Sequence, residues 1–266
     1  MHRRNTLGRM AVLAGLVLGA ASARADVMVY STGFEPAQGY GVADLNGQQA
    51  WEADLTPNDC VVQNADAASG AQAVKITSDG SNPGGWGLGA KRLFADPTGT
   101  DWIVTIAQQV KINALGGAKY SIAVGDGVGD GTPPAWPAAA MQFQPDGRIL
   151  VNGSTMYEDD GVTLVTWTPG QWKEAVLVLD YHTQLVEAYY DGVKITGAIP
   201  EPFMEDHAGL DRINVRTDNS APPTSWMLYD DLSITATPEP ASLSLLALGG
   251  LGLLIRGRRR RQAAVS

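Results

Sequence analysis

Short strand-like runs, separated by turn residues, fill the chain between residues 26 and 237. Val, Ile, Thr and aromatic residues dominate the runs, Gly, Pro and Asp stand between them, and helical periodicity is nearly absent. This pattern predicts one all-β domain, a two-sheet jelly-roll sandwich, because no linker or internal repeat divides the region. The runs are Val27–Tyr30, Ala73–Thr77, Trp102–Ile112, Tyr120–Val124, Met141–Gln144, Arg148–Val151, Trp172–Leu179, Leu185–Tyr190, Val193–Ile195, Arg212–Arg216 and Trp226–Thr235.

Two turn sequences and the two ends of this region constrain the strand order. Pro145-Asp146-Gly147 and Asp191-Gly192 each separate two runs and therefore predict β-hairpins. Val176–Leu179 is apolar on both faces, so we expect it near the centre of a sheet. A closed jelly roll commonly places its first and last strands side by side. Gly33–Glu35 is therefore expected close to Leu228–Asp231.

The N-terminus has the three parts of a secretory signal peptide. Arg3, Arg4 and Arg9 form a basic start, and residues 10–21 form an apolar run without an acidic residue. Ala23-Arg24-Ala25 then supplies small residues at the two positions that a signal peptidase reads. We therefore expect residues 1–25 to be removed by signal peptidase, with the cut after Ala25.

The C-terminus, residues 238–261, also has three parts. Pro238, Glu239 and Pro240 come first and mark a break, because two prolines so close together fit neither a helix nor a paired strand. Residues 241–255 form an uncharged apolar stretch of 15 residues, expected to be a single helix at the short end for a membrane span. The arginines that follow are expected to stay on the cytoplasmic side. They are Arg256, Arg258, Arg259, Arg260 and Arg261.

This ordered tail resembles the PEP-CTERM sorting signal of bacteria. The resemblance implies recognition by an exosortase, a membrane transpeptidase-like enzyme that cuts near the Pro-Glu-Pro sequence. It implies a precursor that is anchored transiently in the inner membrane and then passed to the cell surface or the extracellular space. A plain C-terminal membrane anchor is the alternative.

The charge of the region between the two signals excludes some partners. Residues 26–237 carry 10 Lys and Arg against 27 Asp and Glu, a formal net charge of −17. Such a charge opposes binding to nucleic acid or to an anionic membrane surface. Cys60 is the only cysteine, so an internal disulfide is impossible, and we expect a small buried apolar role for it.

A second resemblance lies in the C-terminal half of the domain. Gly170-Gln171-Trp172, then Val176–Asp180, then Val186–Val193 is similar to laminin-G and concanavalin-A-like domains. This resemblance implies a jelly-roll sandwich over residues 26–237. It does not select a function, because that fold hosts lectins, glycosidases, adhesion modules and structural domains.

The residues expected of a hydrolase are not found in the sequence. Glycoside hydrolysis needs two carboxylates at a fixed separation, and none of the acidic clusters completes the concanavalin-like pattern of alternating carboxylates on one strand. His182 and His207 remain after signal removal, and we expect both to be solvated loop residues. Zinc sites need several His or Cys at ligand spacing, which the sequence lacks. The sequence thus predicts a protein that is not an enzyme.

Calcium is the one cofactor that the sequence favours. Ca²⁺ prefers carboxylate and backbone oxygens held on loops. Glu35 in an opening Phe-Glu, with Asp230 or Asp231 in a closing Tyr-Asp-Asp-Leu-Ser, resembles the structural calcium site of β-sandwich carbohydrate-binding modules. We expect Glu35 and Asp230 to be its ligands; edge carboxylates facing water are the alternative.

Loop tryptophans are the candidates for sugar binding. Trp86 and Trp136 lie among Gly and Pro residues that would hold an aromatic ring rigidly on a loop. Trp102, Trp172 and Trp226 lie in predicted strands and are expected in the core. We therefore expect an exported surface or matrix protein whose sandwich acts in adhesion or weak binding of extracellular polysaccharide. A polysaccharide-active enzyme and a purely structural matrix protein are the alternatives.

Overall fold

The strands between Asp26 and Pro238 form two β-sheets. The structure is a computed structural model, and it describes residues 26–53, 60–78, 82–93, 102–125, 137–157, 163–197, 199–207, 209–219 and 224–238. The expected signal peptide and the apolar helix at 241–255 lie outside these residues. Within them, no helix combines the length and the apolarity that crossing a membrane requires.

The larger sheet, sheet A, contains the last strand of the domain in its interior. Its path is β13-β12-β11-β6-β16-β4-β3, with β1 also paired to β16 and β14 to β12. Its strands are β1 (Val27–Thr32), β3 (Cys60–Gln63), β4 (Ala73–Thr77), β6 (Trp102–Ile112), β11 (Lys173–Asp180), β12 (Leu185–Tyr190), β13 (Val193–Lys194), β14 (Glu201–Pro202) and β16 (Trp226–Pro238).

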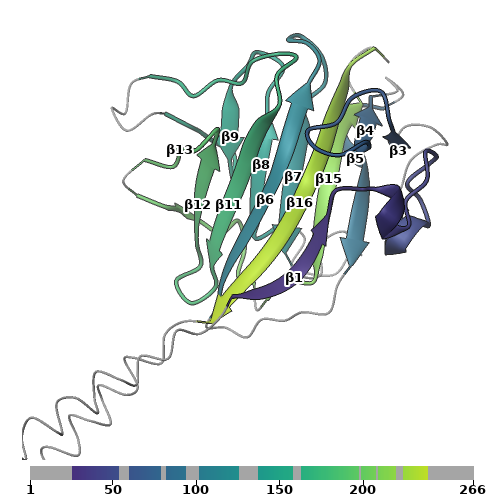
Figure 1. Ribbon diagram of the computed structural model, residues 1–266. Helices are drawn as coiled ribbons and strands as arrows, with labels where there is room; N and C mark the ends of the chain where they lie inside the picture. The colour runs from purple at the N-terminus through teal and green to yellow at the C-terminus, as the bar shows by residue number, and fades with distance from the viewer. Residues whose placement is uncertain are drawn as a thin grey trace, which may run out of the picture. The chain divides into compact units, whose positions relative to one another are not determined.

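The smaller sheet, sheet B, forms the second layer, behind sheet A in Figure 1. Its order is β10-β9-β8-β7-β15-β5-β2, and all of its pairings are antiparallel. Its strands are β2 (Trp51–Ala53), β5 (Asn82–Leu93), β7 (Tyr120–Gly125), β8 (Ala139–Phe143), β9 (Ile149–Val151), β10 (Ser154–Thr155) and β15 (Arg212–Asn219). Two antiparallel sheets face to face confirm the predicted all-β sandwich.

Alternating side chains of both sheets fill the space between the two layers. Strand β6 buries every second residue from Val104 onward, and β11 does the same from Ala175. At one end of the core, an aromatic cluster joins the N-terminal segment to both sheets. The ring of Phe34 lies edge-on to Tyr229 at 5.3 Å and is tilted against Trp51 at 5.9 Å. Cys60 is buried beside this cluster, as expected, with its Sγ 4.0 Å from the Tyr229 hydroxyl.

Both predicted hairpins and the closure of the two ends are confirmed. Strands β12 and β13 pair across Asp191 and Gly192, which both have positive φ, as the tight turn between them requires. Strands β8 and β9 pair across residues 144–148. β1 pairs antiparallel with β16, and Thr32 lies opposite Leu232. A Cβ placed on Gly33 would lie 3.3 Å from an Asp231 carboxylate oxygen and 3.8 Å from one of Asp230.

The sequence analysis did not predict several of the strands. β2, β10 and β14 are two or three residues long, too short to show alternation. β5 contains Pro83-Gly84-Gly85, which reads as a loop, yet it pairs along β15. Gly89 shows why glycine is needed there, since a Cβ would lie 2.1 Å from the Val215 carbonyl oxygen.

One polar side chain lies in the core between the sheets. Gln108 occupies an inward position of β6, between Ile106 and Val110, and is 1% exposed. Its Oε1 and Nε2 atoms have no hydrogen-bond partner among the described residues. A buried amide without partners costs about 1–3 kcal/mol of stability.

We expect Gln108→Met to raise the free energy of unfolding by about 1–3 kcal/mol, since it removes the unpaired amide at similar volume. Gln109→Met, one residue along on the outward face of β6, is the matched control and should change it by less than about 0.5 kcal/mol. Denaturant unfolding of residues 26–237 measures both values. A destabilised Gln108→Met variant would contradict the assignment.

Candidate functional site

Carboxylates from both ends of the domain hold the loop between β3 and β4, residues 64–72. Glu35, just after β1, accepts hydrogen bonds at its Oε1 from the backbone N–H groups of Ala71 (2.8 Å) and Gln72 (3.1 Å). Gly70 has positive φ, and a Cβ there would lie 2.2 Å from the same Glu35 oxygen. A side chain at position 70 would therefore collide with the carboxylate that fixes the loop.

Asp230 and Asp231, on β16, hold the other half of the same loop. The Oδ2 atom of Asp230 accepts from the N–H groups of Ala68 (3.0 Å) and Ser69 (3.3 Å). The Ser69 hydroxyl donates to Asp231 at 2.7 Å. Burial raises the pKa of the Asp230 carboxyl to about 6, and the negative charge of Asp231 adds to the rise, although three backbone N–H donors oppose it.

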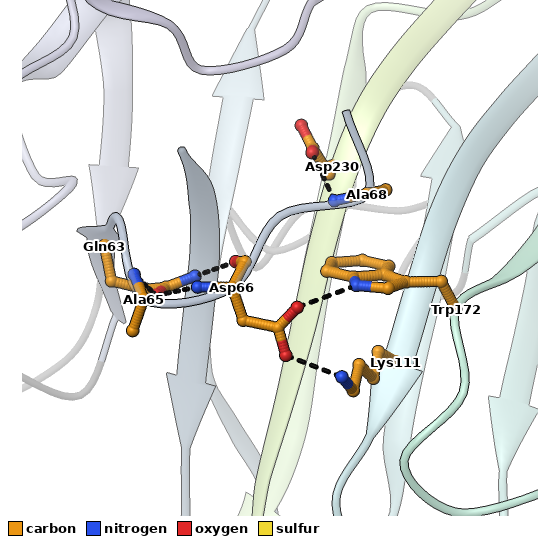
Figure 2. A network of polar contacts seen from close by, with 7 residues as sticks. All are labelled: Gln63, Ala65, Asp66, Ala68, Lys111, Trp172 and Asp230. Carbon is orange, nitrogen blue, oxygen red and sulfur yellow. Dashed lines mark hydrogen bonds and ion pairs between the residues drawn. The ribbon is translucent and has the colours of Figure 1, made fainter. Parts of the chain in front are cut away.

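A fourth carboxylate, Asp66, belongs to this loop and binds side chains in the middle of sheet A (Figure 2). Its Oδ1 accepts from the Trp172 indole N–H at 3.0 Å, and its Oδ2 lies 2.6 Å from the Lys111 ammonium. Burial would raise the pKa of Asp66, but the hydrogen bonds from Lys111 and Trp172 outweigh it and lower the pKa below its ordinary value. The loop therefore closes part of the outward face of sheet A.

The predicted metal ligands Glu35 and Asp230 are thus close together, as the sequence indicated. Together with Asp231 they surround Gly33, and no ion pair among the described residues involves any of the three. No group of three His, Cys, Asp or Glu side chains among the described residues has the arrangement of a metal site. The calcium role stays a prediction.

The outward face of sheet B is the second cluster of polar side chains, and we call it the polar face. Its residues alternate with core residues: Ser121 lies between Tyr120 and Ile122, which both belong to the core. The strand register aligns them in rows across β8, β7, β15 and β5. The polar face consists of Lys91, Ser121, Gln142, Arg212, Asn214 and Arg216.

Four members of the polar face are buried although they face away from the core. Ser121 is 1% exposed, Asn214 4%, and Gln142 and Arg212 8% each. The Ser121 hydroxyl has no hydrogen-bond partner among the described residues. In the register, Ser121 stands between Gln142 on β8 and Arg216 on β15, whose longer side chains extend beyond it.

Positive charge is concentrated on the polar face. It carries three of the 10 basic residues that the sequence places between residues 26 and 237. Lys91 pairs with Glu52 at 3.2 Å, and the Nε of Arg212 lies 3.1 Å from Asp211. Glu52 is a carboxylate at an outward position of sheet B and lies opposite Lys91 on β2.

The carboxylates on the outward face of sheet A have structural partners. Glu187 accepts from the Lys194 ammonium at 2.6 Å and from the Tyr189 hydroxyl at 2.9 Å. The hydrogen bond from Lys194 outweighs burial and lowers the pKa of Glu187. Asp180 accepts from two backbone N–H groups of the following turn. A glycosidase acid needs a raised pKa, so Glu187 does not have the properties of one.

Several residues lie elsewhere than the sequence predicted. Trp86 is part of strand β5 and not of a loop, and Trp136 lies outside the described residues. Trp172 and Trp226 are half-buried outside the core, next to Lys111 and Lys75 respectively. Trp102 does pack against the core.

His207 was wrongly predicted to be solvated, whereas His182 is exposed in a turn as expected. His207 is buried, its backbone N–H donates to the Gln184 side chain, and its ring lies 6.5 Å from that of Phe203. Sequence reasoning missed the polar face entirely. The alternation of Arg212, Asn214 and Arg216 with apolar residues was the available signal.

The tail matches a described sorting signal. Residues 236–261 match the PEP-CTERM protein-sorting motif. This motif implies a precursor that is exported, passes through the membrane and is processed by an exosortase. No match to a curated protein sequence is found.

Solved structures with a similar fold are β-sandwich domains of carbohydrate-active proteins. The endo-β-1,4-glucuronan lyase of the fungus Trichoderma reesei superposes with a TM-score of 0.53 at 13% identity, covering 78% of this chain and 95% of the lyase. A carbohydrate esterase from the Shiga toxin-encoding bacteriophage phi24B gives 0.50 at 14%, covering 79% and 99%. A sialidase gives 0.51 at 12%, covering 76% of this chain but 19% of the sialidase. At these identities the likeness shows the fold alone.

The raised pKa of Asp230 has a consequence for stability. Its pKa is about 6 in the folded protein and close to the ordinary aspartate value of 3.8 in the unfolded chain. The stabilising contribution is therefore fully present below about pH 4 and is lost as the pH rises through 6. The difference of about two pKa units corresponds to about 3 kcal/mol at most.

We expect the free energy of unfolding of the wild type, relative to Asp230→Asn, to increase as the pH falls from 7 to 4. Paired denaturant melts in a chelating buffer measure this difference, and Asp211→Asn serves as the control. A difference that is constant with pH, or that changes in the opposite direction, would show that burial does not govern this carboxyl.

Proposed function

We propose that this protein is exported and binds extracellular polysaccharide through its β-sandwich without cleaving it, at the cell surface or in the surrounding matrix. The polar face is the observation that carries the proposal. Hydroxyl, amide and guanidinium groups lie together there on a rigid sheet, and these are the groups that fix the orientation of sugars. A purely structural sheet face would not need a buried, unpaired hydroxyl such as that of Ser121.

The sorting motif supports the location. A protein that is exported and released from a membrane-anchored precursor meets polysaccharide outside the cell. We propose that the signal peptide is cut after Ala25 and the tail near Pro238, Glu239 and Pro240.

The pairing of β16 supports a cut at Pro238, Glu239 and Pro240 and not further upstream. The matched motif begins at residue 236, but β16 extends to Pro238 and pairs with β1 as far as Ala236. Thr237 also donates a hydrogen bond to Asp26 at 2.6 Å. A cut before Pro238 would remove the end of this strand. We therefore place the cut after Pro238.

The polar face also supports binding over hydrolysis. Two carboxylates about 5–10 Å apart are needed for glycoside hydrolysis. Glu52, an outward carboxylate of sheet B, is paired with Lys91. Asp230, whose pKa is raised, is fully buried and bonded to loop N–H groups, so it is a poor general acid.

We expect protein recovered from outside the cell to have mass-measured ends near Asp26 and after Pro238, and to bind polysaccharide saturably on a glycan array without releasing sugar products. Trp86→Ala and Trp136→Ala test the tryptophans predicted from the sequence. Released products would favour the enzyme alternative, and absence of binding to every glycan would favour a purely structural matrix protein. Retention of residues through Ser266 would contradict the processing.

We also propose that a Ca²⁺ ion stabilises the closure between β1 and β16 at Glu35 and Asp230, with Asp231 as a neighbour. The three acidic side chains around Gly33 have no ion pair among the described residues, so a divalent cation would compensate their charge. Such an ion would supply structural stability and no chemistry.

Added Ca²⁺ is expected to raise the melting temperature of the wild type, and a chelator to lower it. Glu35→Gln should abolish this response, whereas Glu187→Gln, on the outward face of sheet A, should retain it. An identical wild-type melting temperature with Ca²⁺ and with chelator would contradict the proposed calcium site.

A further inference from the structure

The two ends of the described domain meet in sheet A, where β1 and β16 lie side by side (Figure 1). The strands run antiparallel, and the last pair in their register is Val27 opposite Ala236. One residue beyond that pair, the Thr237 hydroxyl donates a hydrogen bond to the Asp26 carboxylate at 2.6 Å. Opposite residues of antiparallel strands have Cα atoms about 4.5–5.5 Å apart. The first and last residues of the domain are therefore within reach of each other.

Both strands are held by the fold up to this point. β16 lies between β6 and β1 in sheet A, and its inward residue Ala236 is 0% exposed. On β1, the Tyr30 ring lies 4.2 Å from the Arg92 guanidinium of sheet B, and its hydroxyl is 2.9 Å from that of Tyr40. The meeting of Asp26 and Thr237 therefore continues the ordered pairing of two anchored strands.

The proposed processing would create two reactive groups at this place. Removal of the signal peptide after Ala25 frees the α-amino group of Asp26, and such groups are partly unprotonated near neutral pH. The resemblance of the tail implies a transpeptidase-like enzyme, and a transpeptidase cuts through a covalent acyl-enzyme. An amine that attacks this acyl-enzyme takes over the acyl group.

Distance decides which amine reaches the acyl-enzyme first. Pro238 directly follows Thr237 in the chain, so an acyl group formed at Pro238 is one residue away from the partner of Asp26. Groups joined by a short flexible connection meet at effective concentrations of about millimolar, and well-oriented groups at far higher ones. An amine from another molecule would have to match that concentration at the enzyme.

The chain length between the paired strands fits such a closure. A cut after Pro238 leaves Thr237, Pro238 and Asp26 between the paired residues Ala236 and Val27. Hairpin loops of three to five residues are common. Joining the two ends would therefore add a hairpin loop and would preserve the pairing of β1 with β16.

We propose that processing joins the two ends of the domain into a ring by a peptide bond between Pro238 and Asp26. The enzyme thiol adds to the Pro238 carbonyl carbon, the peptide bond to Glu239 breaks, and the tail leaves as an amine that takes up the thiol proton. The Asp26 nitrogen then attacks the thioester, the new amide forms, and the enzyme thiol regains a proton from that nitrogen. This inference rests on the proposed processing and adds the covalent fate of both ends.

The test is mass spectrometry of the protein exported by cells that carry the full chain, its signal peptidase and its exosortase. A ring has a mass lower by one water molecule than the linear chain of the same residues, and it resists N-terminal sequencing. The two processing boundaries then appear in a single peptide of a protease digest, in which Pro238 precedes Asp26. A linear chain with a free Asp26 amine would overturn the inference, as would another molecule attached at Pro238.

Thr237→Val removes the hydrogen bond to Asp26 and should lower the ring-closed share of the processed protein about threefold or more. Thr235→Val is the matched control, because Thr235 lies opposite Met28 on the same face of β16, and it should close like the wild type. An equal ring-closed share in both variants would show that the contact between the ends does not direct the closure, and would overturn the inference.

The outcomes separate this inference from the processing on which it rests. Linear protein with ends at Asp26 and Pro238 would leave the proposed processing intact and overturn only the ring. Retention of residues through Ser266 would defeat the processing and the ring together.

Discussion

The pairing of β16 with its neighbours is the constraint on which the rest of this domain depends. The last strand lies inside sheet A, between β6 on one side and β4 and β1 on the other. Sheet A is therefore complete only after β16, the last strand of the domain, has been synthesised. Because β1 and β16 are partners, Asp26 and Thr237, at the two ends of this domain, lie side by side.

The outward faces of the two sheets carry different kinds of side chains. Glu35 and Asp230 accept hydrogen bonds from backbone N–H groups of the β3–β4 loop, and Asp66, within that loop, pairs with Lys111. The loop therefore covers part of the outward face of sheet A. The outward face of sheet B carries basic and amide groups, although residues 26–237 as a whole are acidic. The fold thus places the carboxylates that hold the β3–β4 loop on sheet A and a cluster of basic and amide groups on sheet B.

The sequence predicted those parts of the fold that local chemistry decides. Alternation located most long strands, and the Asp191-Gly192 turn located a hairpin, because both signals act over a few residues. The proximity of Glu35 to Asp230 followed from the closure of a jelly roll. The strand β5 was missed because pairing with β15 overrides its Gly and Pro content.

The sites were harder to predict, because they depend on what lies across a sheet. Trp172 looked like a core residue, but Asp66, from a loop far away in the sequence, binds its indole on the outside. His207 looked like a loop residue, but Phe203 and Gln184 enclose it. The polar face arises from four strands, and no single run of sequence shows that Ser121, Gln142 and Asn214 are neighbours.

The most direct measurement of the central claim is a two-dimensional ¹⁵N NMR titration of residues 26–237 with acidic and neutral oligosaccharides. Binding at the polar face predicts that the side-chain amide signals of Gln142 and Asn214 and the backbone signal of Ser121 shift most, with little change along β11 and β12. Shifts concentrated instead on Val176 and Glu187, on the outward face of sheet A, would contradict the account.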